Sequence, residues 1–441
     1  MLIRQNLPYS PDSSHWLARV RDLGRPVWLD SARPFCSRGR YDIISAAPLA
    51  ALDAAAGPGD PFDAVRARLH DLFAPGVADH ELPFSGGAIG LFGYDLGRAL
   101  ERFPAHAGAR PPFPDLLLGF YSWAVVSDHR QRRTTLVIRP ETPAPLAREL
   151  QRRLGAAAAP DQGGAFALQS PWREEFDAAA YRAAFERLQD YIHSGDCYQV
   201  NLARRFRAAF RGDPLTAYLR LRPVAAAPFS AYLESEQGAV LCLSPERLLA
   251  SRDRDLLTQP IKGTAPRASD ADTDRALAQE LRESAKNRAE NLMIVDLLRN
   301  DLGRSCEAGS IAVDQLFELQ SFATVHHLVS SVRGRLRRDQ HPLDALRHCF
   351  PGGSITGAPK IRAMQIIDEL EPQPRSVFCG AIGYIDRDGR MDTNITIRTL
   401  LACGSELYAW AGGGIVADSQ CEDELQETLN KIEPLLRALA S

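Results

Sequence analysis

The sequence predicts an α+β protein in which long antiparallel strands are mixed irregularly with helices. Apolar residues make up 45% of the 441 residues and charged residues 24%, which is typical of a folded protein with sizeable cores. Helical and extended patterns alternate without the regular period of a doubly wound parallel sheet. The length allows two or three domains, or one large two-layer domain.

The first part of the chain is expected to form short strands and turns, with one helix over about 61–73. Between Glu141 and Gln169, prolines, glycines and a run of alanines interrupt any hydrophobic period, so we expect a connection without regular structure there. We therefore divide the chain into an N-terminal region, 1–165, and a second region, 170–441, that is interleaved with the first.

The second region carries stronger patterns. Four apolar residues recur at helical spacing within 177–193, between an initial Asp and a closing Gly195. Further helices are expected over 358–370, 421–439 and 272–302, the last continuous or broken once, with Leu292, Val295 and Leu298 facing inward. Strands are expected over 198–206, 229–233 and 239–243, within the extended stretch 311–336, and as a hairpin of 377–385 and 391–401 around the turn at 386–389.

Composition argues against several classes of partner. Lys and Arg (52) nearly balance Asp and Glu (55), which disfavours nucleic acid or a polybasic membrane contact. The longest apolar run, 116–126, is too short to span a bilayer, and no secretory signal precedes Pro8, so a cytoplasmic location is expected. The eight cysteines are scattered singly, which predicts reduced thiols without a zinc site or disulfide framework.

Charged residues in the last predicted helix suggest a site for an anion and a cation. Glu424, Glu427 and Lys431 share one helix face, and the preceding run 411–415 contains three glycines whose amides can approach an anion closely. A divalent cation could bridge such carboxylates to a ligand carboxylate. Glu290, in the helix 285–301, supplies a possible opposing carboxylate. The alternative for both helices is an ordinary solvated, charged face.

Two further segments carry possible chemistry. A glycine turn at 351–360 precedes a helix, and the free backbone amides at the start of that helix could bind a carboxylate or phosphate. The turn lacks the spacing of a nucleotide P-loop, and the alternative is a turn with a purely structural role. Lys262 is flanked by proline, isoleucine and glycine, so it is a candidate for a desolvated, nucleophilic amine; the alternative is a loop lysine that extends to water. Of the adjacent His326 and His327, at most one can face a given site if both lie in a strand.

Five segments occur in the order and spacing of the chorismate-utilising enzymes, and they are Ser244-Pro-Glu-Arg247, Pro260-Ile-Lys-Gly-Thr264, 289–301, Gly353-Ser-Ile-Thr-Gly-Ala-Pro-Lys360 and Glu427-Thr-Leu-Asn-Lys431. The chain resembles this family closely from about Phe176 onward and more loosely before it. The family includes anthranilate, aminodeoxychorismate, isochorismate and salicylate synthases. The resemblance implies a fold of two antiparallel β-sheets packed as a sandwich with surrounding helices.

Two positions distinguish members of the family. Gln199 stands where the water-using members have a lysine base, and a neutral amide cannot activate water, so ammonia is the expected nucleophile. Lys262 stands where anthranilate synthases usually have alanine, and a lysine here is typical of the aminodeoxychorismate synthases. The resemblance therefore implies conversion of chorismate and ammonia to 4-amino-4-deoxychorismate, for para-aminobenzoate and folate biosynthesis. The alternatives are an anthranilate synthase component I or a catalytically silent paralogue that binds chorismate.

The resemblance also implies roles for individual residues. Lys262 adds to C2 of the chorismate ring, and Glu246 is the general acid that assists departure of the C4 hydroxyl. Mg²⁺ is held by Glu290 and Glu427, with Glu424 in support. The remaining implied site residues are His327 and Thr264 on the reacting face, and Ser354, Arg398, Gly414, Lys431 and Gly263 in substrate binding.

The family resemblance implies a partner as well. The chain has no Gly-x-Cys-x-Gly nucleophile turn, so ammonia is expected from a separate glutamine amidotransferase subunit. Two positions depart from the family pattern. Asn287 replaces a residue that is acidic in many relatives, and Trp28-Leu-Asp-Ser31 only partly matches an element with which anthranilate synthases sense tryptophan. For that element we expect a structural remnant rather than a feedback site.

Overall fold

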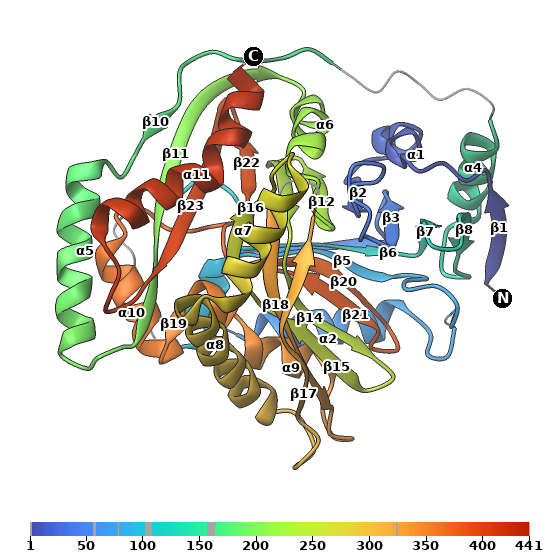
Figure 1. Cartoon of the computed structure of the whole chain (residues 1–441). Helices are drawn as coiled ribbons and strands as arrows, with labels where there is room; N and C mark the ends of the chain where they lie inside the picture. The colour runs from blue at the N-terminus through green and yellow to red at the C-terminus, as the bar shows by residue number, and fades with distance from the viewer. Residues whose placement is uncertain are drawn as a thin grey trace.

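The computed structural model describes residues 2–55, 59–77, 79–101, 108–156, 164–322 and 325–440. Two large sheets, antiparallel throughout, pack face to face and carry helices around them, as Figure 1 shows. Phe92, Phe120 and Ile382 of one sheet share a continuous apolar core with Val240 and Trp410 of the other. The α+β class is therefore confirmed, and so is the sandwich of two antiparallel sheets.

The first sheet combines strands from both ends of the chain. Its order is β1 (Ile3–Leu7), β8 (Arg133–Ile138), β7 (Trp123–Asp128), β3 (Tyr41–Ser45), β2 (Val27–Asp30), β12 (Phe229–Ser235), β13 (Gly238–Ser244), β22 (Thr399–Cys403), β23 (Glu406–Ile415), β11 (Gln199–Gly212) and β10 (Arg173–Glu174). The short strands β9 (Phe166–Leu168) and β19 (Gly357–Ala358) pair with the two ends of β11. In this sheet β2 pairs directly with β12, which joins the N-terminal region to the second region.

The second sheet is built in the same mixed way. Its order is β16 (Ile261–Pro266), β18 (Val325–Arg335), β15 (Asp255–Gln259), β14 (Arg247–Arg252), β21 (Met391–Asn394), β20 (Ala381–Asp386), β5 (Gly87–Phe92), β6 (Leu116–Tyr121) and β4 (Ala50–Ala54), with β17 (Ala312–Ser321) also paired to β18. Here β5 pairs with β20. Strands from 1–165 and from 170–441 are thus hydrogen-bonded to each other in both sheets.

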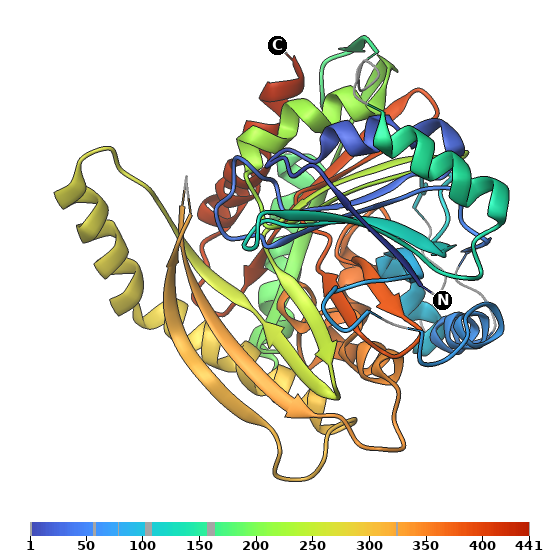
Figure 2. The ribbon, with the colours of Figure 1, turned by 90° about the vertical axis from the view of Figure 1, so that its right-hand side faces the viewer.

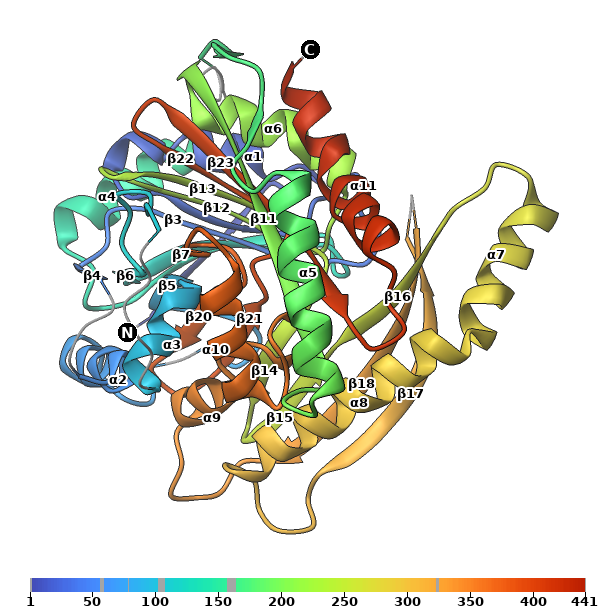
Figure 3. The same cartoon turned by 90° about the vertical axis from the view of Figure 1, so that its left-hand side faces the viewer.

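Helices cover the sheets on their outer sides. They are α1 (Ser14–Ala18), α2 (Pro61–Leu72), α3 (Gly97–Leu100), α4 (Ala144–Gly155), α5 (Ala178–His193), α6 (Pro214–Ala225), α7 (Ala271–Glu283), α8 (Ala285–Gly303), α9 (Pro342–Cys349), α10 (Lys360–Leu370) and α11 (Cys421–Ala440), with 3₁₀ turns η1 (Arg21–Leu23), η2 (Tyr94–Leu96) and η3 (Gly353–Ile355). α7 and the ends of the β16–β18 strands extend away from the rest of the molecule in Figure 2. Figure 3 shows α5 and α11 beside each other over the first sheet.

The long predicted helix over 272–302 is broken once, between α7 and α8. Ser284 leaves the helical region with ψ of 110°, and its Oγ accepts a hydrogen bond from the backbone N–H of Asn287 (3.3 Å) to begin α8. Val295 and Leu298 are buried as predicted, but Leu292 is 47% exposed, which corrects our expectation. The buried face of α8 follows Asn291, Val295 and Leu298, and Leu292 lies one position beside it.

Two other expectations about the elements were wrong in part. α4 occupies a stretch in which we expected no regular structure, because Pro145 falls in its first turn, where a proline is compatible with a helix, and Leu150 and Leu154 are buried. In the rest of that stretch, 157–163 lie outside the described residues, and 166–168 form the short strand β9, which pairs with β11. The hairpin of β20 and β21 forms around 386–389, but its second arm ends at Asn394; Arg398 has a φ of 50°, and β22 then joins the other sheet.

All eight cysteines are free thiols, which confirms that none forms a disulfide, and seven of them are buried. Of the helices in the described ranges, none combines the length and the apolar character that crossing a membrane requires.

Candidate active site

All twelve residues predicted to form the site line one cavity of about 870 Å³. Its walls come from β16, the start of α8, the end of β23 and the α11 helix, with η3 and Arg398 closing the side toward the sheets. The predicted residues it brings together are Glu246, Lys262, Gly263, Thr264, Glu290, His327, Ser354, Arg398, Gly414, Glu424, Glu427 and Lys431. Segments more than 180 positions apart in the chain, such as those of Glu246 and Lys431, thus meet in a single space.

Lys262 and Glu246 are connected through Ser354. The Lys262 ammonium donates to the backbone carbonyl of Ser354 (3.1 Å), and the Ser354 hydroxyl donates to Oε1 of Glu246 (2.9 Å). Burial lowers the pKa of Lys262, although the carboxylates of Glu290 and Glu246 oppose the shift. Burial also raises the pKa of Glu246, against the nearby Lys262. A more readily deprotonated amine therefore lies beside a more readily protonated carboxyl group.

Three glutamates also line the cavity. Burial raises the pKa of Glu290 on α8 and of Glu424 on α11. Burial also tends to raise the pKa of Glu427, but the ion pair of Glu427 with Lys431 (2.5 Å) outweighs this effect, so the pKa of Glu427 is lowered. Within the described ranges, no three His, Cys, Asp or Glu side chains are arranged to hold a metal ion by themselves. Any cation here would need ligands from water or substrate in addition.

Glycines and cations form the remaining walls. A Cβ at Gly414 would lie 2.5 Å from Nε2 of Gln199, so a larger residue there would require the Gln199 side chain to move. Gly263 has a φ of 82° at a bulge in β16, a conformation that favours glycine. The Lys431 ammonium donates to the carbonyl of Gly412 (2.9 Å) as well as pairing with Glu427. Burial lowers the pKa of Arg398.

The two adjacent histidines diverge, as the alternation of a strand predicts. His327 faces the cavity, where its Nδ1 lies 2.9 Å from the hydroxyl of Thr264. Burial lowers the pKa of His327 to about 3, so its imidazole is neutral near pH 7. His326 points away and contacts Ser321 and Asp274.

The whole chain can now be compared with known proteins. It matches the family described as chorismate binding enzyme over residues 26–437, which is most of its length. The chain belongs to this family. It is 46% identical to aminodeoxychorismate synthase component 1 of Klebsiella aerogenes, over 99% of this chain and 98% of that protein. It is 38% identical to anthranilate synthase component 1 of Thermus thermophilus, over 86% and 82% of the two chains. The crystal structure of anthranilate synthase component I from Streptococcus pneumoniae superposes with a TM-score of 0.80 at 32% identity, over 91% of this chain and 93% of the other.

Residues that we did not predict also line the site of this chorismate binding enzyme, among them Lys286 and Asn201. One simple observation could have indicated Lys286. Only four of the 52 basic residues are lysines. Lys262, Lys286 and Lys431 line the cavity, and Lys360 pairs with Asp301 (2.6 Å). In a chain that otherwise uses arginine, the few lysines mark positions where a compact ammonium is used instead of a guanidinium.

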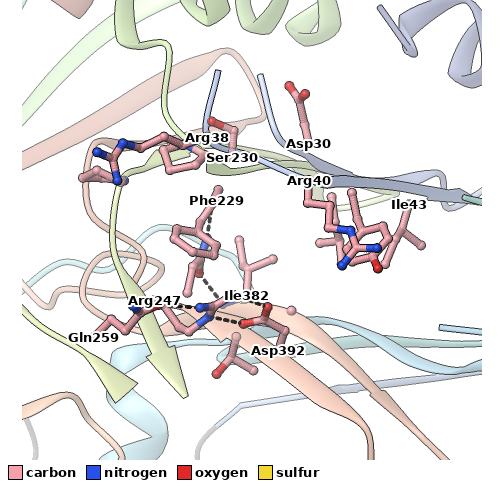
Figure 4. A pocket seen from close by; sticks show the side chains of 18 of the residues that line it. Asp30, Arg38, Arg40, Ile43, Phe229, Ser230, Arg247, Gln259, Ile382 and Asp392 are labelled. Atoms are coloured by element: carbon pink, nitrogen blue, oxygen red, sulfur yellow. Dashed lines mark hydrogen bonds and ion pairs between the residues drawn. The ribbon is translucent and has the colours of Figure 1, made fainter. Parts of the chain in front are cut away.

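This chorismate binding enzyme has a second cavity of about 320 Å³ between the two sheets (Figure 4). Arg247 lies in it, paired with Asp392 (2.8 Å) and packed against the ring of Phe229. None of the twelve predicted site residues lines it; Pro245 and Ile261 border both cavities.

The Trp28-Leu-Asp-Ser31 segment forms β2 and the residue after it, and Asp30 and Leu29 border this second cavity. Asp30 is fully buried and accepts hydrogen bonds from Arg222 (2.7 Å) and Tyr218 (2.8 Å). The segment therefore contributes a buried ion pair to the fold.

Proposed function

We propose that the chain transfers ammonia to chorismate and forms 4-amino-4-deoxychorismate, the activity for which relatives at 45% and 46% identity are named. The observation that carries this proposal is the desolvated Lys262 amine beside the buried Glu246 carboxyl group, both bonded to Ser354. Anthranilate synthases usually lack a lysine at this position. A role for Lys262 as a covalent nucleophile accounts for both its burial and its lowered pKa.

The first half of the reaction would use Lys262 and Glu246 together. The neutral Lys262 amine forms a bond to C2 of the ring, both ring double bonds shift by one position, and the bond from C4 to its hydroxyl breaks. Glu246 gives its proton to the departing hydroxyl, which leaves as water. A carboxyl group with a raised pKa retains that proton until it is needed, and Ser354 keeps it oriented. The product of this half is a secondary ammonium between Lys262 and the ring.

The second half frees Lys262, and Glu246, left as a carboxylate by the first half, regains its proton from solvent before the next turnover. Ammonia forms a bond to C4, both ring double bonds shift back, and the bond between C2 and the Lys262 nitrogen breaks. The positive charge moves from the secondary ammonium to the new C4 ammonium, so Lys262 leaves as a neutral amine. The enolpyruvyl group is retained throughout. His327 is neutral and buried, so in this scheme it orients groups by hydrogen bonding rather than by charge.

The charges of the cavity support a requirement for Mg²⁺. Five acidic side chains line it against four cationic ones, which are Lys262, Lys286, Arg398 and Lys431. A dianionic substrate would therefore enter a space with no excess of positive charge. We propose that Glu290 and Glu427, with Glu424, hold Mg²⁺, which commonly uses one or two protein carboxylates and completes its shell with water and substrate. When bound, it would stabilise negative charge on the ring carboxylate.

The remaining cations are suited to the carboxylates of the substrate. Arg398 and Lys431 are proposed to bind them, together with the glycine segment that contains Gly414, where no side chain obstructs the approach. The relatives are named component 1, which supports the existence of a second component that works with this chain. We propose that this partner is a glutamine amidotransferase that supplies ammonia, in the cytoplasm and for folate biosynthesis.

Incubation of purified protein with chorismate, MgCl₂ and an ammonium salt tests the proposal. We expect a product that is non-fluorescent and retains the enolpyruvyl group by mass spectrometry, and we expect chelation of Mg²⁺ to abolish its formation. Fluorescent anthranilate formed without an added lyase would overturn the proposal and support the second candidate, anthranilate synthase, which the 38% identical relative favours. No turnover of any kind would support a silent paralogue.

A further inference from the structure

A buried ion pair lies directly behind the wall of the substrate cavity. Arg375 and Glu371 are joined by two hydrogen bonds, from Nε to Oε2 (2.9 Å) and from Nη2 to Oε1 (2.6 Å), and their side chains are only 2% and 4% exposed. Neither residue lines the cavity. Removing two charges from water is costly, and apolar side chains of similar volume often stabilise a core equally well. A role that needs directed hydrogen bonds would explain why charged groups are used here.

The remaining hydrogen bonds of the pair go to the backbone of the cavity wall. Nη1 of Arg375 donates to the carbonyl of Ile355 (2.8 Å), and Nη2 donates to the carbonyl of Asn201 (2.9 Å). Both Ile355 and Asn201 line the cavity. Oε1 of Glu371 accepts from the backbone N–H of Ala203 (2.8 Å). The pair therefore connects the η3 turn and the strand β11 to the end of α10.

The turn that Arg375 holds carries Ser354. Ile355, whose carbonyl accepts from Arg375, directly follows Ser354 in the chain. The Ser354 carbonyl accepts from Lys262 (3.1 Å), and its hydroxyl donates to Glu246 (2.9 Å). A guanidinium is planar and directs its N–H groups at fixed angles, so it can bind one carboxylate and two carbonyls at the same time. Movement of the turn would lengthen the hydrogen bond to Glu246 and weaken it.

We infer that Arg375 is a positioning residue, which holds the η3 turn so that the Ser354 hydroxyl orients the carboxyl group of Glu246 for proton transfer. This inference rests on the function proposed above. Because Arg375 does not line the cavity, it acts through the turn and not on the substrate.

The surroundings of Glu246 show how this effect can be measured. The groups that lower the pKa of Glu246 are the ammonium groups of Lys262 and Lys431, the Ser354 hydroxyl and the backbone N–H of Ile261. The buried thiol of Cys379 also lies near this carboxyl group. Of these groups, only the Ser354 hydroxyl belongs to the turn that Arg375 holds. Loosening the turn should therefore weaken one specific hydrogen bond and raise the pKa of Glu246.

Replacement of Arg375 by lysine tests the inference, because lysine keeps the charge opposite Glu371 and removes the planar fork. In single-turnover experiments with chorismate and MgCl₂, we expect formation of the Lys262 adduct to slow about tenfold. We also expect the alkaline limb of the pH profile, where Glu246 loses its proton, to move to higher pH. A loss of packing alone would lower the rate equally at every pH, so an alkaline limb that stays in place would overturn the inference.

A double-mutant cycle with Ser354→Ala tests whether Arg375 acts through the Ser354 hydroxyl. If it does, Arg375→Lys should slow adduct formation at least about threefold less in the Ser354→Ala background than in the native chain. Equal effects in the two backgrounds would overturn the inference. If Arg375→Lys does not fold, Glu371→Gln provides the same cycle, since it keeps an acceptor for Arg375 and removes the charge that fixes the guanidinium.

The chain offers a closely matched control in a second buried ion pair. Arg390 pairs with Asp386 (2.8 Å) in the same i, i+4 arrangement and also donates to a backbone carbonyl, that of Leu82 (2.7 Å). Arg390 does not line the cavity. Arg390→Lys should therefore leave both limbs of the pH profile in place, and an alkaline limb that moved as far as in Arg375→Lys would overturn the inference.

A titration without turnover separates this inference from the proposed function. The carboxyl ¹³C resonance of Glu246, assigned by its loss in Glu246→Gln, reports the pKa of this group in the ligand-free protein. We expect a higher pKa in Arg375→Lys than in the native chain, and an unchanged pKa would overturn the inference. A native chain that forms no adduct with chorismate would instead contradict the proposed function, and the titration would still decide the role of Arg375.

Discussion

Replacing Ser354 by alanine would separate the two partners of the first half-reaction. The hydroxyl of Ser354 donates to Glu246 (2.9 Å), while its backbone carbonyl, which the substitution keeps, accepts from Lys262 (3.1 Å). The hydrogen bond to Glu246 is neutral while the acid holds its proton and becomes charge-assisted as the proton leaves. The difference between a neutral and a charge-assisted hydrogen bond is about 1–2 kcal/mol. The rate of adduct formation should therefore fall roughly 5- to 30-fold.

The pH profile gives this variant a second signature. The rate rises with pH as Lys262 loses its proton and falls again as Glu246 loses its own. Because the bond from Ser354 lowers the pKa of Glu246, removing it should move the alkaline limb to higher pH and leave the acidic limb in place. Single-turnover formation of the Lys262 adduct, followed by quenching and intact-mass measurement, reports both effects. An alkaline limb that moves to lower pH, or an unchanged rate at all pH values, would refute the reasoning.

A matched control removes a hydroxyl of the same kind elsewhere. Ser330 is buried and donates to Asn291 (2.5 Å) outside the cavity. Ser330→Ala should lower the melting temperature without moving either limb of the profile. Ser354→Thr keeps the hydroxyl and should restore part of the rate, provided that the additional methyl group is accommodated.

Three further predictions concern charge. Lys262→Arg keeps a positive charge but supplies a guanidinium that stays protonated and cannot act as a nucleophile. Turnover should therefore fall by at least about 10³-fold, and mass spectrometry should detect no adduct. Retained turnover would exclude a nucleophilic role for Lys262. Arg222→Met leaves Asp30 buried without its ion pair and should lower the unfolding free energy, measured in urea, by about 3–5 kcal/mol. The double variant Arg222→Met, Asp30→Asn should recover much of that loss. Equal losses in the single and the double variant would contradict the charge explanation. Burial lowers the pKa of His341 to about 4, so folding favours its neutral form and the unfolding free energy should fall as the pH drops from about 6.5 to 4. Urea titrations over this range should show a shallower fall for His341→Asn, and an unchanged slope would contradict the explanation.

Motifs in the sequence were sufficient to predict residues that the fold brings into one cavity. Lys262 and Glu427 lie in motifs of which other residues also line the cavity, and Glu290 comes from a third motif. The roles that the family implies for these residues stay predictions. The buried amide atoms of Gln199 and Asn201 that lack a hydrogen-bond partner could not be seen in the sequence, because only the fold decides which groups surround them.

Long-range pairing was the part of the fold that local patterns could not predict. The contacts of β2 with β12 and of β5 with β20 join segments separated by about 200 and 290 positions, and hydrophobic period alone does not select such partners. The misplacement of Leu292 has the same origin. Its helix was recognised, but the face that would be covered depends on β18 and α9, which pack against α8 from outside the helix's own sequence.

The distribution of lysines has a practical consequence for handling the enzyme. Apart from the N-terminal amine, the chain offers four primary amines, and the exposed fractions of Lys286 (48%) and Lys431 (41%) far exceed that of Lys360 (13%). Biotinylation, dye labelling or amine coupling to a sensor surface would therefore modify the rim of the substrate cavity first. Conversely, protection of these amines from an acylating reagent by chorismate would measure occupancy of the cavity without any assay of turnover.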